Sequence, residues 1–255
     1  MTSEILTRQL GVYLLPHFGS RILAAFSGRP YGRERRHEFL RELGLEPGRL
    51  NFVKQVHGNR LIEIQAGVPL PTPEEGDGLV TTTPGRALGI LTADCLPIFV
   101  AEPRHPMVGL IHAGWRGLQQ GVISKAAQLL RDRYGIAPSR VQVVIGPAIR
   151  SCCYEVGEEF RGLFPRSYLS PSNRSTVSVA RRRGRMDLIQ EAFFQFCEAG
   201  FDPLHFFDAG ICTSCQNARF FSARAGDRDE RVLSVIQIRP EGSARMEDGD
   251  SSRIV

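Results

Sequence analysis

Apolar and polar residues alternate along most of the chain in short runs, and a few longer stretches show helical spacing instead. The runs with strand character fall at residues 10–15, 21–26, 50–56, 60–65, 78–82, 87–93, 96–101, 107–112, 140–146, 204–208 and 231–238. The stretches with helical character fall at residues 33–43, 117–134, 155–164 and 186–199. Because strands outnumber helices, we expect mixed sheets with outer helices rather than a uniform βαβ repeat.

The stretch 117–134 has the clearest helical face. Its apolar residues recur at helical spacing, and they are Val122, Ala126, Leu129, Leu130 and Tyr134. Gly135 follows them as a stop signal, so the sequence predicts a helix that ends there.

Length and composition suit one α/β domain. The chain has 255 residues, of which 42% are hydrophobic, and this is enough to bury a sizeable core. No low-complexity linker divides it, so we expect a single domain over residues 1–240. Residues 241–255 are polar and contain Gly and Ser, and we expect this tail to fray.

The charge balance gives little reason to expect a nucleic-acid partner. There are 32 basic and 27 acidic residues, and a net excess of +5 spread over the chain creates a weak field. The densest basic cluster, at residues 181–185, could bind phosphate or RNA, but a solvated loop is the favoured interpretation.

The chain shows no feature of a secreted or membrane protein. Its first residues lack the basic region and long apolar stretch of a signal peptide. The longest apolar run, from Ala87 to Val100, is interrupted by Asp94 and Pro97, and it falls short of the ~20 residues that span a bilayer. We therefore expect a cytoplasmic protein with no membrane partner, in which the six cysteines are thiols or ligands rather than disulfides.

Three segments each place a metal-ligand type at the end of a predicted strand. In KQVHGNR, His57 follows the apolar run; in LGILTADCLPIFV, Cys95 lies at the break between two strands; in MVGLIHAGWRG, a strand ends on His112. Two imidazoles and one thiolate make a zinc set with a fourth position open. The segments are far apart in sequence, so spacing alone leaves buried core residues as the alternative.

The turn HAGWRG, between a strand and a helix, is a candidate anion site. Gly114 and Gly117 let the backbone approach a ligand closely, and the N-terminus of helix 117–134 favours an anion. Arg116 could add a planar, bidentate contact to phosphate. The alternative is a tight turn in which Trp115 packs on the core.

Six motifs occur in the order typical of one known family. They are KQVHG, GDGLVTT, LTADCLPI, HAGWRG, IGPAIRSCCYEVG and CTSCQNARFFSAR, and they cover roughly residues 50 to 225. In these motifs the chain resembles the YfiH-like proteins, also called laccase-domain or peptidoglycan editing factor proteins. The resemblance implies an α/β fold built as a four-layer α/β/β/α sandwich with mixed sheets. It also implies one zinc ion bound by His57, Cys95 and His112.

The resemblance further implies a purine nucleoside phosphorylase, a transferase that acts on adenosine, inosine, guanosine and methylthioadenosine. It implies a hydrolase activity as well, the deamination of adenosine, for which zinc can activate water to attack the purine C6. Asp94, the nearest carboxylate in sequence, is our candidate for proton transfer. Arg116 and Lys54 are our candidates for holding the phosphate that attacks the ribose C1′. The expected partners are thus purine nucleosides and phosphate, and the oligomeric state stays open.

The remaining cysteines give a weaker signal. Cys152 and Cys153 are adjacent, which is too close to chelate one zinc comfortably, so a structural role is favoured. Cys212 and Cys215 have CxxC spacing, but a zinc ribbon would need a second CxxC, and a redox dithiol lacks a thioredoxin-like context.

The last matching segment also departs from the family pattern. Ala223 stands where an aromatic residue is usual, and Glu230-Arg231 replaces a usual Gly-Arg. We therefore carry over no substrate contacts from this segment.

Two other enzyme functions compete with the nucleoside reactions. A His₂Cys set also suits a blue-copper centre of a polyphenol oxidase, or laccase. A multicopper oxidase needs a second, His-rich centre, however, and four of the six histidines fall outside the set without any His-x-His pair. The second alternative is an amidase that removes L-Ser from a peptidoglycan precursor, with zinc or Cys95 as the reactive group. A non-enzymatic binding protein ranks last.

Overall fold

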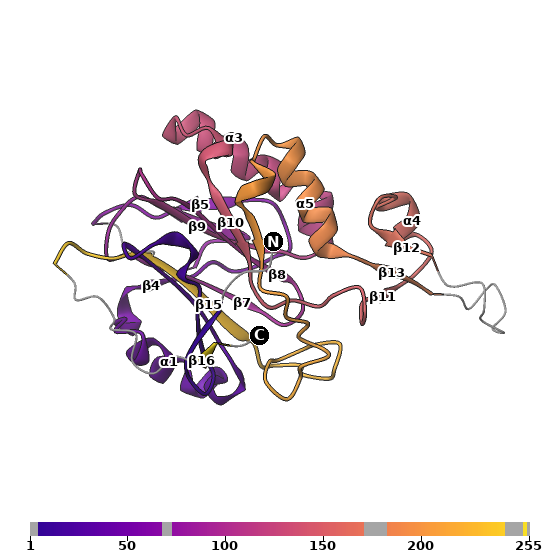
Figure 1. Cartoon of the computed structure of the whole chain (residues 1–255), viewed down its shortest axis with the longest axis horizontal. Coiled ribbons are helices and arrows are strands. Elements are labelled where there is room, and N and C mark those ends of the chain that lie inside the picture. The colour runs from indigo at the N-terminus through magenta and orange to yellow at the C-terminus, as the bar shows by residue number, and fades with distance from the viewer. Residues whose placement is uncertain (1–4, 68–72, 171–182, 243–251, 254–255) are drawn as a thin grey trace.

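The computed structural model describes residues 5–67, 73–170, 183–242 and 252–253. Two large sheets pack against each other, with helices on their outer sides (Figure 1). The expected α/β class with mixed sheets is confirmed.

The larger sheet has seven strands and is mostly antiparallel. Its strands, in spatial order, are β16 (Ser252–Arg253), β1 (Leu6–Gln9), β2 (Val12–Leu14), β3 (Ile22–Ser27), β15 (Val232–Ile238), β7 (Ala87–Thr92) and β4 (Leu50–Asn51). Only the pair of β4 and β7 within this sheet is parallel.

The second sheet has six strands and delivers two of the expected metal ligands. Its order is β14 (Phe206–Asp208), β10 (Gln142–Ile145), β8 (Leu96–Glu102), β9 (Met107–Ala113), β6 (Gly78–Thr81) and β5 (Leu61–Glu63). A small third sheet contains β11 (Glu155–Val156), β13 (Gly184–Met186) and β12 (Tyr168–Leu169).

The α-helices are short and lie on both outer sides of the sheets. They are α1 (Arg36–Glu42), α2 (Trp115–Gln119), α3 (Val122–Tyr134), α4 (Phe160–Leu163) and α5 (Leu188–Glu198). In Figure 1, α3 and α5 lie above the strands and α1 lies below them.

Three clusters of buried apolar side chains hold these elements together. One joins α3 and α5 to β8, β9 and β10, a second fills the space between the two large sheets, and a third joins α1 to β2, β3 and β15. Strand β8 is buried on both faces: Ile98 and Val100 face the helices, whereas Phe99 and Ala101 face the other sheet. This explains why the segment reads as a continuous apolar run instead of an alternating one.

The predicted helix at 117–134 was only partly right. Gly121 adopts a left-handed conformation (φ 75°), which separates α2 from α3. The stop at Gly135 is confirmed, because this residue is also left-handed (φ 63°) and caps α3. The apolar face predicted for this helix packs on the sheet, with Val122, Ala126 and Leu130 buried.

Two other expected elements also differ. The strand expected at 50–56 is reduced to β4, because beyond it the side chain of Gln55 bonds the backbone of Leu91 in place of a strand neighbour, with both distances 2.9 Å. The prediction of a helix at 155–164 was wrong in its first half, where Glu155 and Val156 form β11, and right in its second half, which contains α4. The sequence pattern missed β1, β12 and β13, which are only two to four residues long.

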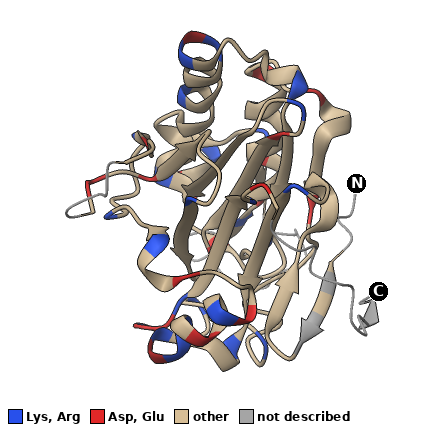
Figure 2. Cartoon of the chain, turned by 90° about the vertical axis from the view of Figure 1, so that its left-hand side faces the viewer, with Lys and Arg blue, Asp and Glu red and all other residues tan. Residues whose placement is uncertain are grey.

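Charged residues are dispersed over the described parts of the chain. Figure 2 shows basic and acidic segments interspersed, mainly outside the central strands. Of the basic cluster at 181–185, residues 181 and 182 lie outside the described residues, and Arg183 and Arg185 are exposed. No helix in the described ranges is long and apolar enough to span a membrane. The tail expected to fray also lies mostly outside the described ranges, apart from 241–242 and β16.

Replacing Phe99 with Ala should destabilise the protein by about 3–5 kcal/mol, because it leaves a cavity between the two large sheets. Phe99 has no exposed surface, whereas Leu204 is 64% exposed and provides the control. Leu204→Ala should change the free energy of unfolding by less than about 0.5 kcal/mol. Urea unfolding of both variants measures the difference, and similar midpoints would contradict this account of the core.

Candidate metal centre

His57, Cys95 and His112 come together although they are far apart in sequence. Their ligand atoms all lie within 4.8 Å of one another. The Sγ atom of Cys95 lies 3.9 Å from Nε2 of His57, and the two imidazole rings meet edge to face at 4.7 Å between centroids. His112 is buried, Cys95 is half-buried and His57 is exposed. The cluster therefore opens toward solvent on the His57 side.

Strand pairing positions two of these residues. His112 lies on β9 and pairs with Pro97 of β8, while Cys95 immediately precedes β8. Gly114 follows β9 at the same end of the sheet. A Cβ atom on Gly114 would lie 2.9 Å from the sulfur of Cys95 and 3.2 Å from the His57 ring, so glycine is required for the approach.

The backbone adopts uncommon conformations at this centre. Among the described residues, only His57 (φ 60°) and Asp94 (φ 95°) have positive φ angles without being glycine. Such conformations cost energy for L-residues and persist where surrounding contacts impose them. At His57 this contact is a hydrogen bond of 2.8 Å from its backbone N–H to Asp77.

Asp77 is the residue that organises the centre. Its carboxylate is fully buried and accepts hydrogen bonds from the backbone N–H groups of Val56, His57 and Gly58, at 3.3, 2.8 and 2.6 Å. It also lies 2.8 Å from Nδ1 of His112. A proton held on Nδ1 leaves Nε2 of His112 available to a metal, and a carboxylate partner makes that nitrogen a better ligand.

The sequence reasoning missed Asp77. It lies in the motif GDGLVTT, directly before a buried strand, and it received no role. The sequence did contain a signal, namely an acidic residue directly before an apolar strand. A carboxylate in such a position is expected to be buried, and a buried carboxylate requires hydrogen-bond or charge partners.

Cys95 and His112 adjust each other's protonation. Burial acts to raise the pKa of Cys95, but His112 and His57 outweigh it and lower this pKa to about 7. Burial acts to lower the pKa of His112, but Asp77 and Cys95 outweigh it and raise this pKa to about 9. The thiolate, which is the form that binds metal, is thus accessible near neutral pH.

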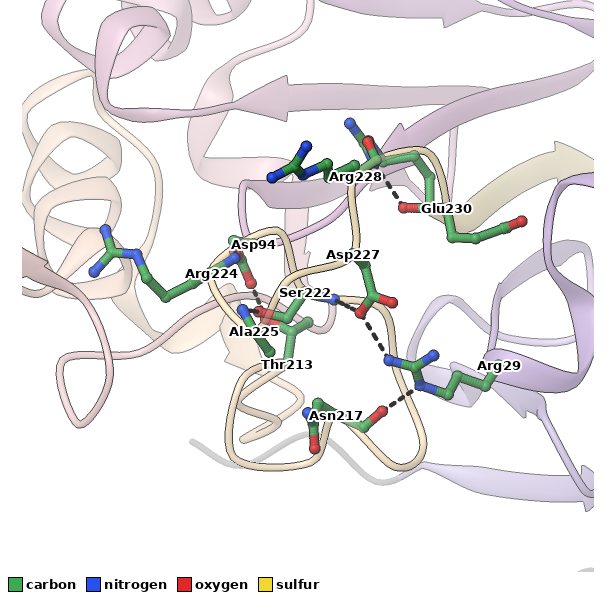
Figure 3. A network of polar contacts seen from close by, with 11 residues as sticks. Arg29, Asp94, Thr213, Asn217, Ser222, Arg224, Ala225, Asp227, Arg228 and Glu230 are labelled. Carbon is green, nitrogen blue, oxygen red and sulfur yellow. Dashed lines mark hydrogen bonds and ion pairs between the residues drawn. The ribbon is translucent and has the colours of Figure 1, made fainter.

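Asp94 adjoins the centre, but its polar atoms are engaged. Its Oδ1 accepts a hydrogen bond from the hydroxyl of Thr213, and its Oδ2 accepts one from the backbone N–H of Arg224, both at 2.7 Å (Figure 3). Its carbonyl oxygen accepts a third, of 2.9 Å, from the N–H of Ile149. These contacts anchor the turn that carries Cys95, and proton transfer by Asp94 stays a prediction.

The two residues expected to hold phosphate are both exposed, in different settings. Lys54 forms an ion pair of 2.9 Å with Glu75. Arg116 lies in α2, four residues after His112, with its guanidinium 4.4 Å from the centroid of the Trp115 ring. None of the ion pairs within the described ranges involves Arg116.

Tyr154 and Arg224 form a surface beside the centre that the sequence reasoning also missed. The Arg224 guanidinium lies 5.2 Å from the Tyr154 ring centroid. Burial, and then the sulfur of Cys95, raise the pKa of Tyr154 to about 12. The charges of Arg224, Asp94 and Arg116 also act on this hydroxyl, so the tyrosine lies among them.

The fold and the centre define an α/β protein with a candidate His–Cys–His metal site. Residues 31–239 match the family described as multi-copper polyphenol oxidoreductase laccase, and the chain belongs to this family. The resemblance to laccase-domain proteins is thereby confirmed.

Known relatives agree with this assignment. Purine nucleoside phosphorylase YlmD of Geobacillus stearothermophilus is 36% identical over 167 residues, which span 65% of this chain and 61% of that protein. Adenosine deaminase RL5, from an unknown prokaryotic organism, is 30% identical over 190 residues, 72% of each chain. The crystal structure of YlmD from G. stearothermophilus superposes with a TM-score of 0.81 at 28% identity, covering 93% of this chain and 100% of that one.

Replacing Asp77 with Asn should weaken metal binding by roughly 10- to 100-fold, because the amide cannot keep the charge-assisted contact to His112. Zinc affinity is measured by competition with a chromophoric chelator. Asp227→Asn is the control, because this carboxylate pairs with Arg29 at 2.7 Å and has no contact with the three candidate ligands. Equal affinities in the Asp77 variant and the wild type would show that the carboxylate does not support the centre.

Proposed function

We propose that this protein is a zinc-dependent purine nucleoside phosphorylase that also deaminates adenosine. The observation that carries the proposal is the exposed side of the His57–Cys95–His112 centre, backed by the buried carboxylate of Asp77. A centre with three protein ligands and an open position is typical of catalytic rather than structural zinc. The names of two relatives, a purine nucleoside phosphorylase and an adenosine deaminase, supply the substrate class.

The donor set fits zinc. Two imidazole nitrogens and one thiolate sulfur make a borderline-soft set, which suits this ion. A zinc ion bound here would supply a Lewis acid and activate water. The protein's own contribution is to hold the ligands: Asp77 orients His112 and the turn at His57, and Gly114 leaves room for the sulfur.

Arg116 and Lys54 are the proposed phosphate contacts. A guanidinium suits phosphate because it presents several donors in one plane. Arg116 forms no ion pair within the described ranges, whereas Lys54 would have to leave Glu75. Arg116 is therefore the principal candidate and Lys54 the secondary one.

Asp94 is the proposed proton-transfer group for deamination. Its Oδ1 accepts from the Thr213 hydroxyl, which can rotate to release that oxygen to a substrate. Its Oδ2 stays bonded to the backbone of Arg224, so the carboxylate keeps its position while one oxygen is used.

The distribution of histidines favours a zinc enzyme over a copper oxidase. Within the described ranges, the second group of candidate ligands contains four cysteines and no histidine, so a His-rich trinuclear copper centre is lacking there. The four remaining histidines are separate: His105 adjoins Glu102, His205 adjoins the carbonyl of Ser139, His17 packs on Phe207, and His37 lies on α1.

Incubation with adenosine, with and without phosphate, tests the function. We expect adenine and ribose 1-phosphate only when phosphate is present, and inosine in either condition, since only the first reaction uses phosphate as the nucleophile. Cys95→Ser should stay folded and lose the zinc of the His57–Cys95–His112 centre together with both activities, because a hydroxyl is a poorer zinc ligand than a thiolate. Chromatography and elemental analysis measure products and metal.

Cys197→Ser is the matched control, because Cys197 lies on α5 and belongs to neither candidate metal group. Free ribose in place of ribose 1-phosphate would make the protein a hydrolase. Turnover of a UDP-muramyl-L-Ser substrate, with no nucleoside turnover, would replace the proposal with the amidase function. Stoichiometric copper would point to an oxidase.

Arg116→Ala should raise the phosphate concentration needed for half-maximal adenine release by about 10- to 100-fold, the effect of losing a charged hydrogen bond of about 1.5–3 kcal/mol. Deamination needs no phosphate and should be unchanged, which separates this effect from unfolding. Lys54→Ala should have a smaller effect, because its ammonium already pairs with Glu75. A phosphate dependence that Arg116→Ala leaves unaltered would remove the residue from this role.

A further inference from the structure

Four of the six cysteines form a second cluster, apart from Cys95. They are Cys152 and Cys153, which are adjacent, and Cys212 and Cys215, which have CxxC spacing. The sulfur of Cys152 lies 3.5 Å from that of Cys212, and the sulfur of Cys215 lies 3.4 Å from Cys152 and 3.3 Å from Cys153. All four sulfurs lie within 4.8 Å of one another. The sequence indicated two unrelated pairs and argued against one zinc shared by the adjacent Cys152 and Cys153. The fold removes that objection, because it gathers both sulfurs with those of Cys212 and Cys215.

Backbone pairing builds this cluster. Ala148 and Cys212 form a parallel bridge, in which the N–H of Ala148 donates to Ile211 at 3.3 Å and the N–H of Thr213 donates to Ala148 at 3.0 Å. On the other side, the N–H of Cys153 donates to the carbonyl of Arg150 at 2.9 Å and closes a turn. The main chain of two segments thus holds the cysteines in place. These segments are far apart in sequence: Cys152 and Cys212 are 60 residues apart.

Packing does not account for all four thiols. Cys212 is buried and Cys153 is half-buried, but Cys152 and Cys215 are exposed. Cysteines that only fill volume are expected in the interior. Two exposed thiols gathered with a half-buried and a buried one indicate a shared ligand.

We propose that Cys152, Cys153, Cys212 and Cys215 bind a second zinc ion in a tetrathiolate site that stabilises the fold. Zinc–sulfur bonds of about 2.3 Å in a tetrahedron place the sulfurs about 3.8 Å apart. The three sulfur–sulfur separations of 3.3–3.5 Å need to widen by only a few tenths of an ångström. Four thiolates without an open position are typical of structural zinc.

Other uses of four thiols fit this arrangement less well. An iron–sulfur cube attaches each cysteine to a different iron atom, and its sulfurs spread wider than they do here. Disulfides would join the sulfurs in fixed pairs, yet Cys215 lies at almost equal distances from Cys152 and Cys153, so the geometry favours no particular pairing. A single ion in the middle uses all four.

A cationic side chain lies beside the four cysteines. The guanidinium of Arg224 donates to the carbonyl oxygens of Cys153 and Glu155 at 3.4 and 3.0 Å. Four thiolates around one zinc ion carry excess negative charge, and a nearby guanidinium offsets part of it.

This cluster is linked directly to the first centre. Thr213, within the CTSC turn, donates its hydroxyl to Asp94, and the N–H of Ile149 donates to the carbonyl oxygen of the same residue. Asp94 precedes Cys95. A second ion would therefore hold in place the segments that anchor the turn of Cys95, and its loss should lower activity while the first metal remains bound.

Zinc counting on the reduced full-length protein tests the second site. The metal-free protein is loaded with excess zinc without oxygen, desalted, and analysed for zinc per chain. We expect about two ions in the wild type and in Cys197→Ser, and about one in Cys215→Ser and in Cys95→Ser. In Cys95→Ser, addition of zinc should still raise the unfolding temperature, because the remaining site binds the folded state.

Two outcomes would overturn the proposal. In the first, the wild type binds a single zinc ion, Cys95→Ser binds none, and Cys215→Ser still binds one. The other is a disulfide among the four cysteines that forms in air even when the reduced protein holds excess zinc, detected by mass spectrometry after thiol alkylation. If Cys215→Ser fails to fold, alkylation of the wild type decides: zinc should protect these four thiols, and their full reactivity would exclude the site.

Discussion

The buried carboxylate of Asp77 is the contact on which the rest of the first centre depends. It binds the three successive N–H groups of the turn at His57, and it also orients His112 on β9. A buried charge without partners would be costly, so the carboxylate and the two ligand segments stabilise each other. One side chain thereby sets the position of one imidazole and the tautomer of another.

The centre combines this internal anchor with strain and close packing. His57 and Asp94 adopt left-handed backbone conformations, and Gly114 lies where any side chain would strike the sulfur of Cys95. Hydrogen bonds from the hydroxyl of Thr213 and the backbone N–H of Arg224 hold the carboxylate of Asp94. Ligands held this firmly need little rearrangement to bind a metal, which suits the proposed catalytic role.

The chain contains two groups of candidate metal ligands, and our proposals give them different functions, one catalytic and one structural. The first has three ligands and an exposed side, where a nucleoside can approach. The second has four sulfurs, and its backbone joins the segments around Ala148 and Cys212. Hydrogen bonds from Thr213 and Ile149 to Asp94 connect the two sites. Metal binding at the second site would therefore stabilise the backbone that positions Cys95 in the first.

The sequence by itself determined the α/β class, the long strands, the end of α3 at Gly135, and His57, Cys95 and His112 as the ligand candidates. These depend on local patterns: apolar periodicity, a glycine stop and a ligand type at each strand end. Only the tertiary structure decided the split at Gly121, the short strands of the small sheet, the role of Asp77 and the meeting of Cys152 and Cys153 with Cys212 and Cys215. The reason is that apolar periodicity and turn residues report the local conformation of a segment. They do not report which distant strand or loop will contact it.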